Sequence, residues 1–367
     1  MKKIIYIIKS RLHFYPPCVS QIRILKELGY DVEVLFGSCD INTIKILENE
    51  KIKMHNIVEI KDENANKIRK IIDIIKLRMN LRKKLKEYSN DNTIYWFGNA
   101  ESAILMKGAL KNKKYIVSLL ELYDYDKLKG WLLHGIVEKS LKTTVCEENR
   151  AYLVKKEYNL NYVPTIFPNK PYNQITRKCI NPSNDVTENI INKIKNDNVI
   201  IYQGYIWEAE ELIELAKALN EIEKKYKLVL LGIDYYNSYE KVKKIYENCV
   251  FFPYVPAPLH LEITSYARIG LLYYRNHRLN NVYCAPNKIY EYSGFGIPMI
   301  GNNIPGLKYT IGYNRCGQCI EMTKEKFIDA INEIEKNYEE YSANAIKFYE
   351  SCDSSEKMKS FLKEIEI

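Results

Sequence analysis

The chain has 367 residues, of which 46% are hydrophobic. This composition is typical of a globular protein, and the length exceeds one ordinary domain and suits two α/β domains. No run of eighteen apolar residues occurs, so no transmembrane helix is predicted. The net charge of +9 is divided unevenly: residues 1–170 hold 31 basic and 20 acidic residues, whereas the remainder holds 24 and 26. We therefore expect the two halves to meet different partners.

Targeting and redox signals point to the cytoplasm. The N-terminal lysine pair precedes an apolar run of five residues without a small-residue cleavage site, which predicts a first strand rather than a signal peptide. The nine cysteines, an odd number without framework spacing, indicate a reducing compartment. Cys316-Gly-Gln-Cys319 has no second cysteine pair, so we interpret it as structural rather than as a zinc or redox site.

The first half alternates strands and helices, the pattern of a doubly wound parallel sheet. Ligands of such sheets bind past the carboxyl ends of the strands. The turn at 10–17, which contains His13 and Tyr15, is therefore expected to face that edge, although a histidine packed in a loop is an equal alternative. Glu121 and Asp124 follow a later strand end and are candidates for an acceptor pocket. The expected strands are 4–8, 32–36, 52–58, 93–97 and 115–120, the expected helices are 19–28, 100–110 and 129–141, and a final strand, helix and strand occupy 143–169.

A strongly basic segment runs from Lys67 to Lys86, with nine basic residues and one acid. Apolar residues recur along it at helical spacing. Such a helix can bind an anionic membrane surface, which would place the protein peripherally on the inner face of the membrane. The alternative is a helix that packs on its own sheet with a solvated outer face, and the isoleucine pattern fits both. The apolar positions are Ile68, Ile71, Ile72, Ile75, Met79 and Leu85.

A polar stretch rich in proline and asparagine separates the halves, and the strand–helix pattern then restarts. We divide the chain into a first domain at 1–170, a linker at 171–197 with a helix at 186–195, a second domain at 198–342, and C-terminal helices within 343–367 that are both expected to pack back on the first domain. In the second domain the expected strands are 199–203, 228–232, 250–252 and 269–273, and the expected helices are 209–225 and 239–247. The last two helices are expected at 343–349 and 355–365.

The stretch from Tyr283 to Gly306 predicts a loop, a short helix that starts near Pro286, a glycine stop and a buried strand. Asn287, Lys288 and Glu291 would share one face near the helix N-terminus. Free N–H groups and a lysine there suit a phosphate, and a glutamate can accept two hydrogen bonds from a ribose diol. A nucleotide-sugar site is therefore plausible. The alternative is a capped amphipathic helix with a solvated Lys/Glu pair.

The motif Pro286-Asn287-Lys288-x-x-Glu291-Tyr292-x-x-x-Gly296-x-Pro298 resembles the donor site of GT-B glycosyltransferases, specifically the retaining enzymes of family 4. The resemblance covers nearly the whole chain and implies an α/β fold of two Rossmann-like, doubly wound domains facing across a cleft. It also implies a C-terminal helix that crosses back to the first domain, and a first domain that binds the acceptor. Lys288 and Glu291 would be catalytic, with Glu291 on the ribose. The implied donor-binding residues are Gly204, Tyr205, Tyr254, Val255, Arg275, Arg278, Tyr283, Ala285, Pro286, Asn287 and Tyr292.

Two positions depart from the family pattern. Relatives carry a basic pair just after the glycine of the first strand in domain two, whereas Gly204 is followed by residues 205–208 without a base. Tyr283 stands where the first glutamate of the E-x7-E pair is expected. The charge for the diphosphate must then come from Lys288, Arg275 or Arg278. Asp124-Tyr-Asp126 matches a D-x-D metal motif, but it lies in the wrong half and lacks a third ligand, so no metal site is predicted.

The resemblance implies a metal-independent sugar transfer with retained configuration, without a cofactor, from a UDP-, GDP- or other nucleotide sugar. The acceptor would be a glycan or a lipid-linked sugar in the assembly of a cell-surface polysaccharide or glycolipid, and nucleic acid is not an expected partner. Two alternatives stay open. One is a nucleotide-sugar epimerase or phosphorylase on the same fold, and the other is a non-catalytic nucleotide-sugar-binding subunit of another transferase.

Overall fold

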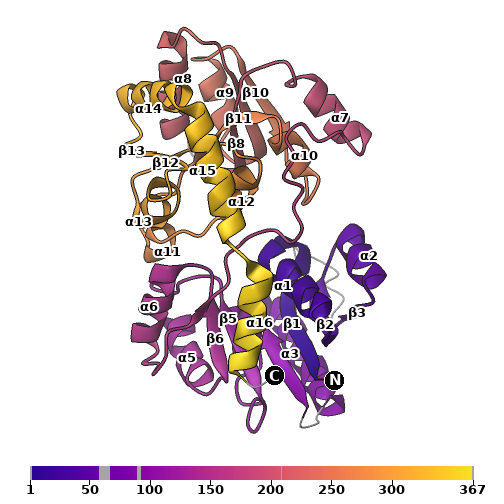
Figure 1. Cartoon of the computed structure of the whole chain (residues 1–367). Helices are drawn as coiled ribbons and strands as arrows, with labels where there is room; N and C mark the ends of the chain where they lie inside the picture. The colour runs from indigo at the N-terminus through magenta and orange to yellow at the C-terminus, as the bar shows by residue number, and fades with distance from the viewer. Residues whose placement is uncertain (1, 58–66, 89–91, 208, 366–367) are drawn as a thin grey trace. The chain divides into compact units, whose positions relative to one another are not determined.

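The computed structural model describes residues 2–57, 67–88, 92–207 and 209–365 (Figure 1). Contacts within the chain divide it into two compact units. Unit 1 comprises Met1–Tyr172, Arg278–Asn280 and Asp353–Ile367, and unit 2 comprises Asn173–His277 and Asn281–Cys352. Over the described ranges, we find no helix with the length and apolar character that a membrane span requires.

Unit 1 is built on a parallel sheet with the strand order β3-β2-β1-β4-β5-β6-β7. Its central strands are buried on both faces, which explains why they read as continuous apolar runs. The strands are β1 (Lys3–Arg11), β2 (Asp31–Ser38), β3 (Lys53–Asn56), β4 (Thr93–Phe97), β5 (Tyr115–Leu119), β6 (Lys142–Val145) and β7 (Thr165–Ile166). The helices are η1 (Leu12–Phe14), α1 (Pro16–Glu27), α2 (Ile41–Asn49), α3 (Lys67–Glu87), α4 (Ala100–Leu105), α5 (Lys127–Val137), α6 (Glu148–Glu157) and α16 (Ser354–Glu364).

Most expected elements of unit 1 are present, with shifted ends. The first strand extends through Arg11, so the first two residues of the expected 10–17 turn belong to β1. Helix α1 begins at Pro16 rather than at Val19 because two prolines occupy its first turn, where their missing N–H groups cost nothing. Helix α2 is not predicted by the sequence analysis, although the Asp40 side chain caps it by accepting the Thr43 N–H at 2.9 Å. Val58, the expected end of the third strand, lies outside the described residues.

Unit 2 contains a second parallel sheet with the order β10-β9-β8-β11-β12-β13. The strands are β8 (Val199–Ile206), β9 (Lys227–Asp234), β10 (Cys249–Pro253), β11 (Ala267–Leu272), β12 (Met299–Asn302) and β13 (Gly317–Ile320). The helices are α7 (Asp185–Asn192), α8 (Glu210–Glu221), α9 (Ser238–Lys243), α10 (His260–Thr264), α11 (Leu279–Val282), α12 (Asn287–Gly294), α13 (Pro305–Leu307), η2 (Lys308–Gly312), α14 (Lys324–Lys336) and α15 (Tyr338–Ser351). Residues 279–280 of α11 group with unit 1. Two parallel sheets flanked by helices confirm the expected doubly wound α/β class.

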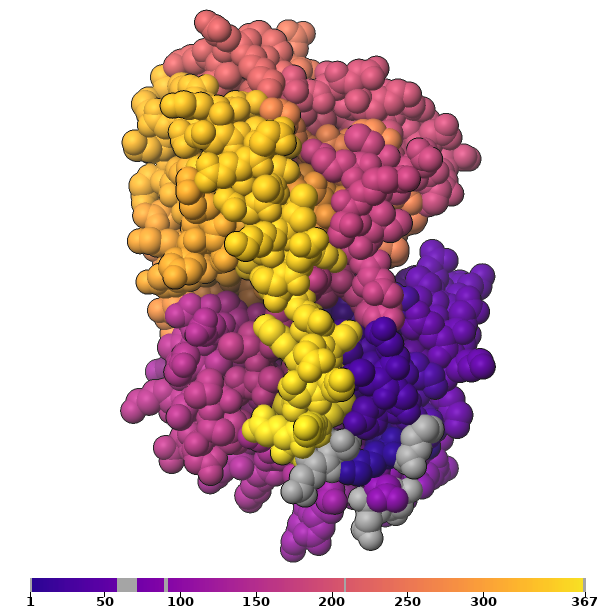
Figure 2. Space-filling model, viewed as in Figure 1, coloured from indigo at the N-terminus to yellow at the C-terminus, as the bar shows by residue number. Residues whose placement is uncertain are grey.

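The two C-terminal helices belong to different units (Figure 1). Helix α16 joins the core of unit 1, where Met358, Phe361 and Leu362 are almost fully buried. The Phe361 ring lies 5.6 Å from that of Trp96 and 5.4 Å from that of Phe167, and the outer face of the helix stays exposed (Figure 2). Helix α15 instead packs on α12 in unit 2. The expectation that both helices return to the first domain is therefore wrong for α15.

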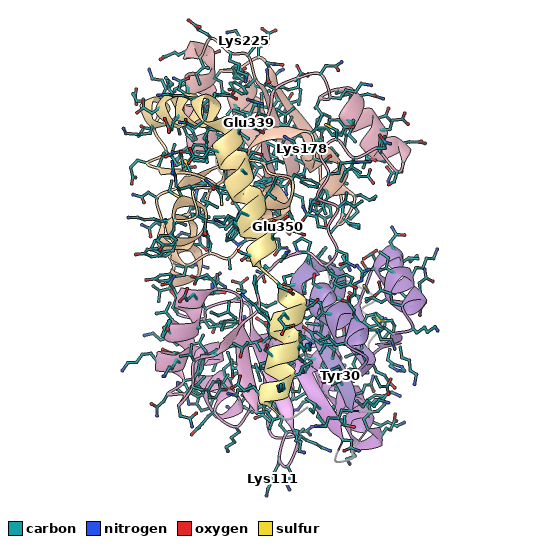
Figure 3. All side chains as sticks on the ribbon, viewed as in Figure 1. Tyr30, Lys111, Lys178, Lys225, Glu339 and Glu350 are labelled. Carbon is teal, nitrogen blue, oxygen red and sulfur yellow. The ribbon has the colours of Figure 1, made fainter. Side chains whose placement is uncertain are left out.

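None of the nine cysteines, all of which lie in the described part of the chain, forms a disulfide bond. Cys316 is buried and Cys319 lies in strand β13, so the C-x-x-C pair belongs to the framework of unit 2, as the sequence indicates. Charged side chains such as Lys111, Lys225 and Glu350 project from the surface (Figure 3).

Candidate active site

The expected loop, helix, glycine stop and buried strand are present between Tyr283 and Asn302. Pro286 is the N-cap of α12 and has extended backbone angles. Its missing N–H group costs nothing there, because no hydrogen bond within the helix would use it. Beyond the helix Gly296 has φ +62, a left-handed conformation that glycine adopts without strain. Strand β12 then runs through the core, fully buried. The local sequence thus places the first turn of α12 beside the carboxyl ends of the strands.

Lys288 lies in that first turn, and its ammonium group is directed at the backbone of β8. Lys288 Nζ donates a hydrogen bond to the hydroxyl of Tyr274 at 3.3 Å. Gly204 has φ +118, and a Cβ atom added there would lie 3.1 Å from Lys288 Nζ. Burial lowers the pKa of Lys288 below its ordinary value of 10.5, while the charge of Glu291 opposes this shift. The site therefore places a desolvated cation beside Gly204, where no side chain covers the main chain.

Glu291, one turn further along the same face, is only 6% exposed. One carboxylate oxygen, Oε2, accepts a hydrogen bond from Gln203 Nε2 at 2.5 Å, and Oε1 lies 3.3 Å from His260 Nε2. Gln203 is held in turn by Thr264, whose hydroxyl donates to Gln203 Oε1 at 2.8 Å. A carboxylate offers about four acceptor positions, so positions remain that can accept hydrogen bonds from the two hydroxyls of a diol.

This network joins β8, α10 and α12, and the sequence analysis missed three of its members. Gln203 carried a signal, because it is the last residue of an apolar strand run just before a glycine, where ligand-facing side chains occur. His260 and Thr264 carried none, since α10 was not predicted. His260 Nδ1 is buried and has no hydrogen-bond partner among the described residues.

The other donor-site candidates of unit 2 follow strand ends or precede α12. Tyr205 and Tyr254 directly follow Gly204 and β10 and are each 50% exposed, whereas Val255 is buried. Carboxyl ends of parallel strands share one edge of the sheet, so Gly204, Tyr254 and Arg275 lie along that edge. The remaining members, Tyr283, Ala285 and Asn287, are partly buried in the segment that leads into α12.

Two expected donor contacts do not fit this arrangement. Tyr292 is fully buried in the core, where its ring fills the space beside Gly270, so it supports α12 rather than lining a surface. Arg278 groups with unit 1, and its guanidinium lies 4.4 Å above the ring of Tyr125. Lys288 and Arg275 are therefore the candidate phosphate cations within unit 2.

In unit 1, Glu121 and Asp124 line a pocket together with Tyr123 and Leu279. Asp124 Oδ2 accepts the Leu279 N–H at 3.2 Å, and Asp126 caps α5 by accepting the Lys129 N–H at 3.0 Å. The two aspartates of the D-x-D sequence thus have separate structural roles. Tyr15, partly buried, is the N-cap of α1 and packs on the core of this unit.

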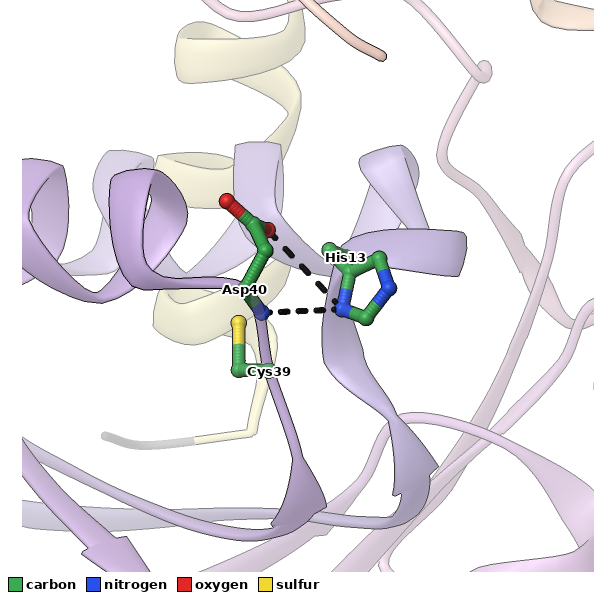
Figure 4. A group of neighbouring side chains, drawn as sticks. All are labelled: His13, Cys39 and Asp40. Carbon is green, nitrogen blue, oxygen red and sulfur yellow. Dashed lines mark hydrogen bonds and ion pairs between the residues drawn. The ribbon is translucent and has the colours of Figure 1, made fainter. Parts of the chain in front are cut away.

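His13, Cys39 and Asp40 offer three metal-binding atom types within 4.8 Å of one another (Figure 4). However, His13 Nδ1 accepts the Asp40 N–H at 3.1 Å, and one Asp40 oxygen caps α2. Burial also raises the pKa of Cys39 to about 11, which disfavours the thiolate that a metal needs. The described contacts thus give His13 a structural role that ties η1 to α2.

No protein-family model matches the chain, and no curated protein sequence does either. Solved structures do match over the full length. Anabaena HepE in complex with UDP aligns at 11% identity and a TM-score of 0.68, covering 99% of both chains. A glycosyltransferase from Rickettsia africae aligns at 14% identity and a TM-score of 0.65, covering 99% of this chain and 97% of that one. WaaG, a glycosyltransferase involved in lipopolysaccharide biosynthesis, aligns at 13% identity and a TM-score of 0.63, covering 99% of both.

These structures share their fold with the present chain while differing from it at most positions. The fold implied by the α12 motif, an α/β chain with two doubly wound parallel sheets of the GT-B class, is therefore confirmed.

Proposed function

We propose that this protein is a glycosyltransferase that moves a sugar from a nucleotide-sugar donor to an acceptor hydroxyl. The fold is shared with solved glycosyltransferases, of which HepE has been crystallised with UDP-glucose. Because fold alone does not define activity, the proposal depends on the site in unit 2. The resemblance of the α12 motif to retaining family 4 enzymes supports transfer with retained configuration.

One observation carries the proposal: Lys288 and Glu291 share a face of α12, a desolvated ammonium and a buried, oriented carboxylate beside the bare backbone of Gly204. A desolvated ammonium whose described hydrogen-bond acceptor is a tyrosine hydroxyl favours an incoming anion. The carboxylate, held by Gln203 and His260, presents its remaining acceptor positions to a diol. A nucleoside diphosphate carries both groups that this pair would bind, a diphosphate for the ammonium and a ribose diol for the carboxylate.

In the proposed reaction the bond between the anomeric carbon and the diphosphate oxygen breaks, and its electron pair stays with the diphosphate. The acceptor oxygen forms the new bond on the same face of the sugar, and its proton leaves with the diphosphate. Lys288 and the free N–H groups of α12 stabilise the negative charge that develops on the leaving group. Because these groups supply the charge, we propose a metal-independent reaction.

The Glu291→Ala variant tests the site directly. Loss of hydrogen bonds between the carboxylate and the ribose should weaken uridine, UDP and GDP binding alike, by about 1.5–3 kcal/mol. Isothermal titration of the wild type and the variant measures this, with exposed Glu350→Ala as the matched control. Nucleotide affinity that is equal in wild type and Glu291→Ala would contradict the assignment.

A non-catalytic role is the second candidate, and one observation favours it. Residues 205–208 contain no base, and α8 begins with Glu210 and Glu211, so the diphosphate would face acids where relatives carry cations. A binding subunit would hold UDP or another nucleotide without turning over any nucleotide sugar. Hydrolysis of a panel of nucleotide sugars, with and without a lipid extract, separates the two: any enzyme-dependent release of free nucleotide excludes the binding subunit.

We also propose that unit 1 binds an anionic membrane through α3, which would bring the protein to a lipid-linked acceptor. Leu77, Leu81 and Leu85 form the face that packs on unit 1. The opposite face carries an isoleucine stripe that stays in solvent, and the same face continues into basic residues toward the end of the helix. The exposed members are Ile71, Ile72, Ile75 and Met79, followed by Arg82 and Lys86; the side chain of Ile68 lies outside the described part of the chain.

Liposome co-sedimentation tests this proposal. Each basic residue near an anionic surface contributes roughly 1 kcal/mol, and salt screens the effect. Binding should therefore require anionic lipid, fall at about 0.5 M salt, and drop in a variant with four glutamines at Arg82, Lys83, Lys84 and Lys86. The charge-matched control replaces four exposed lysines elsewhere in unit 1, namely Lys51, Lys111, Lys139 and Lys156. If the wild type stays in the supernatant at low salt, the stripe has another role and a soluble acceptor is favoured.

A further inference from the structure

Four exposed aromatic side chains form one continuous cluster at the carboxyl edge of the unit 2 sheet. Tyr205 and Trp207 come from the end of β8, and Tyr235 and Tyr236 follow β9. Each is between 50% and 55% exposed. The Tyr235 ring stacks on Trp207 at 5.1 Å and on Tyr205 at 5.8 Å, and Trp207 contacts Tyr236 at 6.3 Å. We name these four residues the aromatic platform.

The backbone holds the rings of the platform outward. Ile206 is buried, so its neighbours Tyr205 and Trp207 point together to the other face, as alternation along a strand requires. The Asp234 carboxylate accepts the N–H groups of Tyr236, Ser238 and Tyr239 at 3.2, 2.9 and 2.8 Å, which fixes the loop after β9. The Tyr235 N–H also bonds to the Ile206 carbonyl at 3.4 Å. These hydrogen bonds fix the platform and connect its two segments, which follow neighbouring strands.

The acidic residues around the platform limit the kind of ligand that can bind to it. Residues 203–216 contain four acidic and no basic residues, and residues 232–240 contain two acidic and no basic residues. An anionic membrane or a nucleic acid would be repelled there, in contrast to α3 in unit 1. The rings are all tyrosine and tryptophan, which combine an apolar face with a polar edge. A neutral ligand with both apolar faces and hydroxyl groups matches this surface.

A sugar ring has that chemistry. The axial C–H groups of a pyranose form an apolar face whose slightly positive hydrogens are attracted to the negative face of an aromatic ring. The hydroxyls around its rim can donate hydrogen bonds to carboxylates, and the two segments that carry the platform are rich in acidic residues. Several rings at spacings of 5.1–6.3 Å offer contact to more than one sugar residue in a row.

Position links the platform to the candidate active site. Tyr205 directly follows Gly204, where an added Cβ would lie 3.1 Å from Lys288 Nζ. The three residues from Gly204 to Trp207 span about 10 Å of extended chain at most. We propose that the aromatic platform binds a neutral oligosaccharide, the non-reducing end of the acceptor chain. Its role as acceptor rests on the proposed transferase, whereas oligosaccharide binding itself does not.

A neutral glycan array probed with the purified full chain tests the proposal. The array contains maltohexaose, cellohexaose, laminarihexaose, and hexosamine- and galactose-containing oligosaccharides. The wild type should bind at least one of them. Removal of one stacking ring costs about tenfold or more in affinity where stacking carries the binding, so Trp207→Ala and the double variant Tyr235→Ala/Tyr236→Ala should lose that signal. Trp131→Ala, which removes an exposed tryptophan from unit 1, should keep it.

A second measurement uses Trp207 as its own reporter. In a Trp131→Phe background the remaining tryptophans are buried Trp96 and exposed Trp207. Bound oligosaccharide should shield Trp207 and reduce quenching by acrylamide. The proposal is overturned if no neutral glycan binds, or if the platform variants bind as the wild type does. It is also overturned if they lose instead a wild-type affinity for phosphatidylcholine vesicles or a concentration-dependent dimer, which would assign the surface to a lipid or a second copy.

Thermal-shift titration with UDP separates this inference from the proposed function. The platform variants Trp207→Ala and Tyr235→Ala/Tyr236→Ala should retain the UDP shift of the wild type, which also confirms that they fold. A wild type that binds glycans through the platform but shows no thermal shift with UDP, GDP or ADP would contradict the proposed transferase and leave the platform proposal intact. UDP binding without any glycan binding would contradict the platform proposal and leave the proposed transferase intact.

Discussion

Lys288 is the residue whose chemistry the fold modifies most clearly. A lysine ammonium taken out of water is costly unless it is paired, and burial accordingly lowers its pKa from 10.5. The unfolded chain binds that proton more tightly than the folded chain does. The charged lysine therefore opposes folding at every pH below 10.5, and the penalty disappears only above that value. A site that is costly when empty is a common property of binding sites.

We expect Lys288→Met to stabilise the nucleotide-free protein at pH 7 and to weaken UDP relative to uridine. The gain in stability should shrink as the pH rises from the lowered pKa of the folded state and vanish above 10.5, where the wild-type lysine is neutral in both states. The loss for UDP should be about 1.5–3 kcal/mol, the worth of a charged hydrogen bond, with uridine unchanged. Urea unfolding and calorimetric titration measure the two effects, with exposed Lys111→Met as control. A variant that loses uridine as strongly as UDP would show that Lys288 does not contact the diphosphate.

The same residue scale shows how far the sequence predicts the site. Spacing alone places Lys288 and Glu291 on one helical face, and the structure confirms that placement. The partners of Glu291 were out of reach because Gln203 and His260 are 88 and 31 positions away along the chain, on other elements. Only tertiary packing brings such groups together, and no local propensity reports it.

At the scale of elements, α14 shows a helix that could have been predicted. Thr323 caps it by accepting the Lys326 N–H, and Phe327, Ala330, Ile331 and Ile334 repeat at helical spacing and are buried. This pattern predicts a helix that is missing from the expected elements of the second domain given above. The contact that ties α14 to the sheet was not visible in advance, because Glu335 bonds to Arg268 of β11, 67 positions earlier.

Glu335 predicts an acid-sensitive attachment of α14. Burial alone would raise its pKa, but hydrogen bonds from Arg268, Lys224 and Tyr226 lower it to about 2. The stabilisation is therefore complete above the unfolded value of 4.5 and is lost as the pH falls through about 2. We expect Glu335→Gln to cost about 1.5–3 kcal/mol at pH 7, and the difference from wild type to shrink between pH 4.5 and 2.

Urea unfolding across that pH range measures the effect, and exposed Glu339→Gln is the matched control. A difference between wild type and Glu335→Gln that persists unchanged at pH 2 would show that the carboxylate charge is not what holds the helix.

At the scale of the molecule, the sequence predicts two α/β units and a returning C-terminal helix, but not the point at which the chain returns. Both last helices have a comparable apolar stripe, so their patterns do not distinguish the sheet that each one covers. The structure assigns α15 to unit 2 and α16 to unit 1. Element order was sufficient for the fold class because strand–helix alternation permits few other architectures.

The ring contacts of α16 predict a unit-specific loss of stability. Phe361 packs between Trp96 and Phe167 and is almost fully buried. Phe361→Ala should therefore destabilise unit 1 by about 3–5 kcal/mol. Differential scanning calorimetry should show a lowered transition for unit 1 and an unshifted one for unit 2, whereas exposed Lys359→Ala in the same helix should change neither. A fall of both transitions together would mean that the two units unfold as one.

The return of α16 to unit 1 also makes unit 2 an insertion within unit 1. During synthesis, residues 2–172 emerge first, yet their sheet lacks Met358, Phe361 and Leu362 until unit 2 has been made. At about 5–20 residues per second, the ribosome needs roughly 10–40 seconds to add the intervening 180 residues. Throughout that interval the nascent first sheet exposes the Trp96 and Phe167 rings. The last-made helix therefore closes the first-made domain, and a chaperone would find its binding surface there.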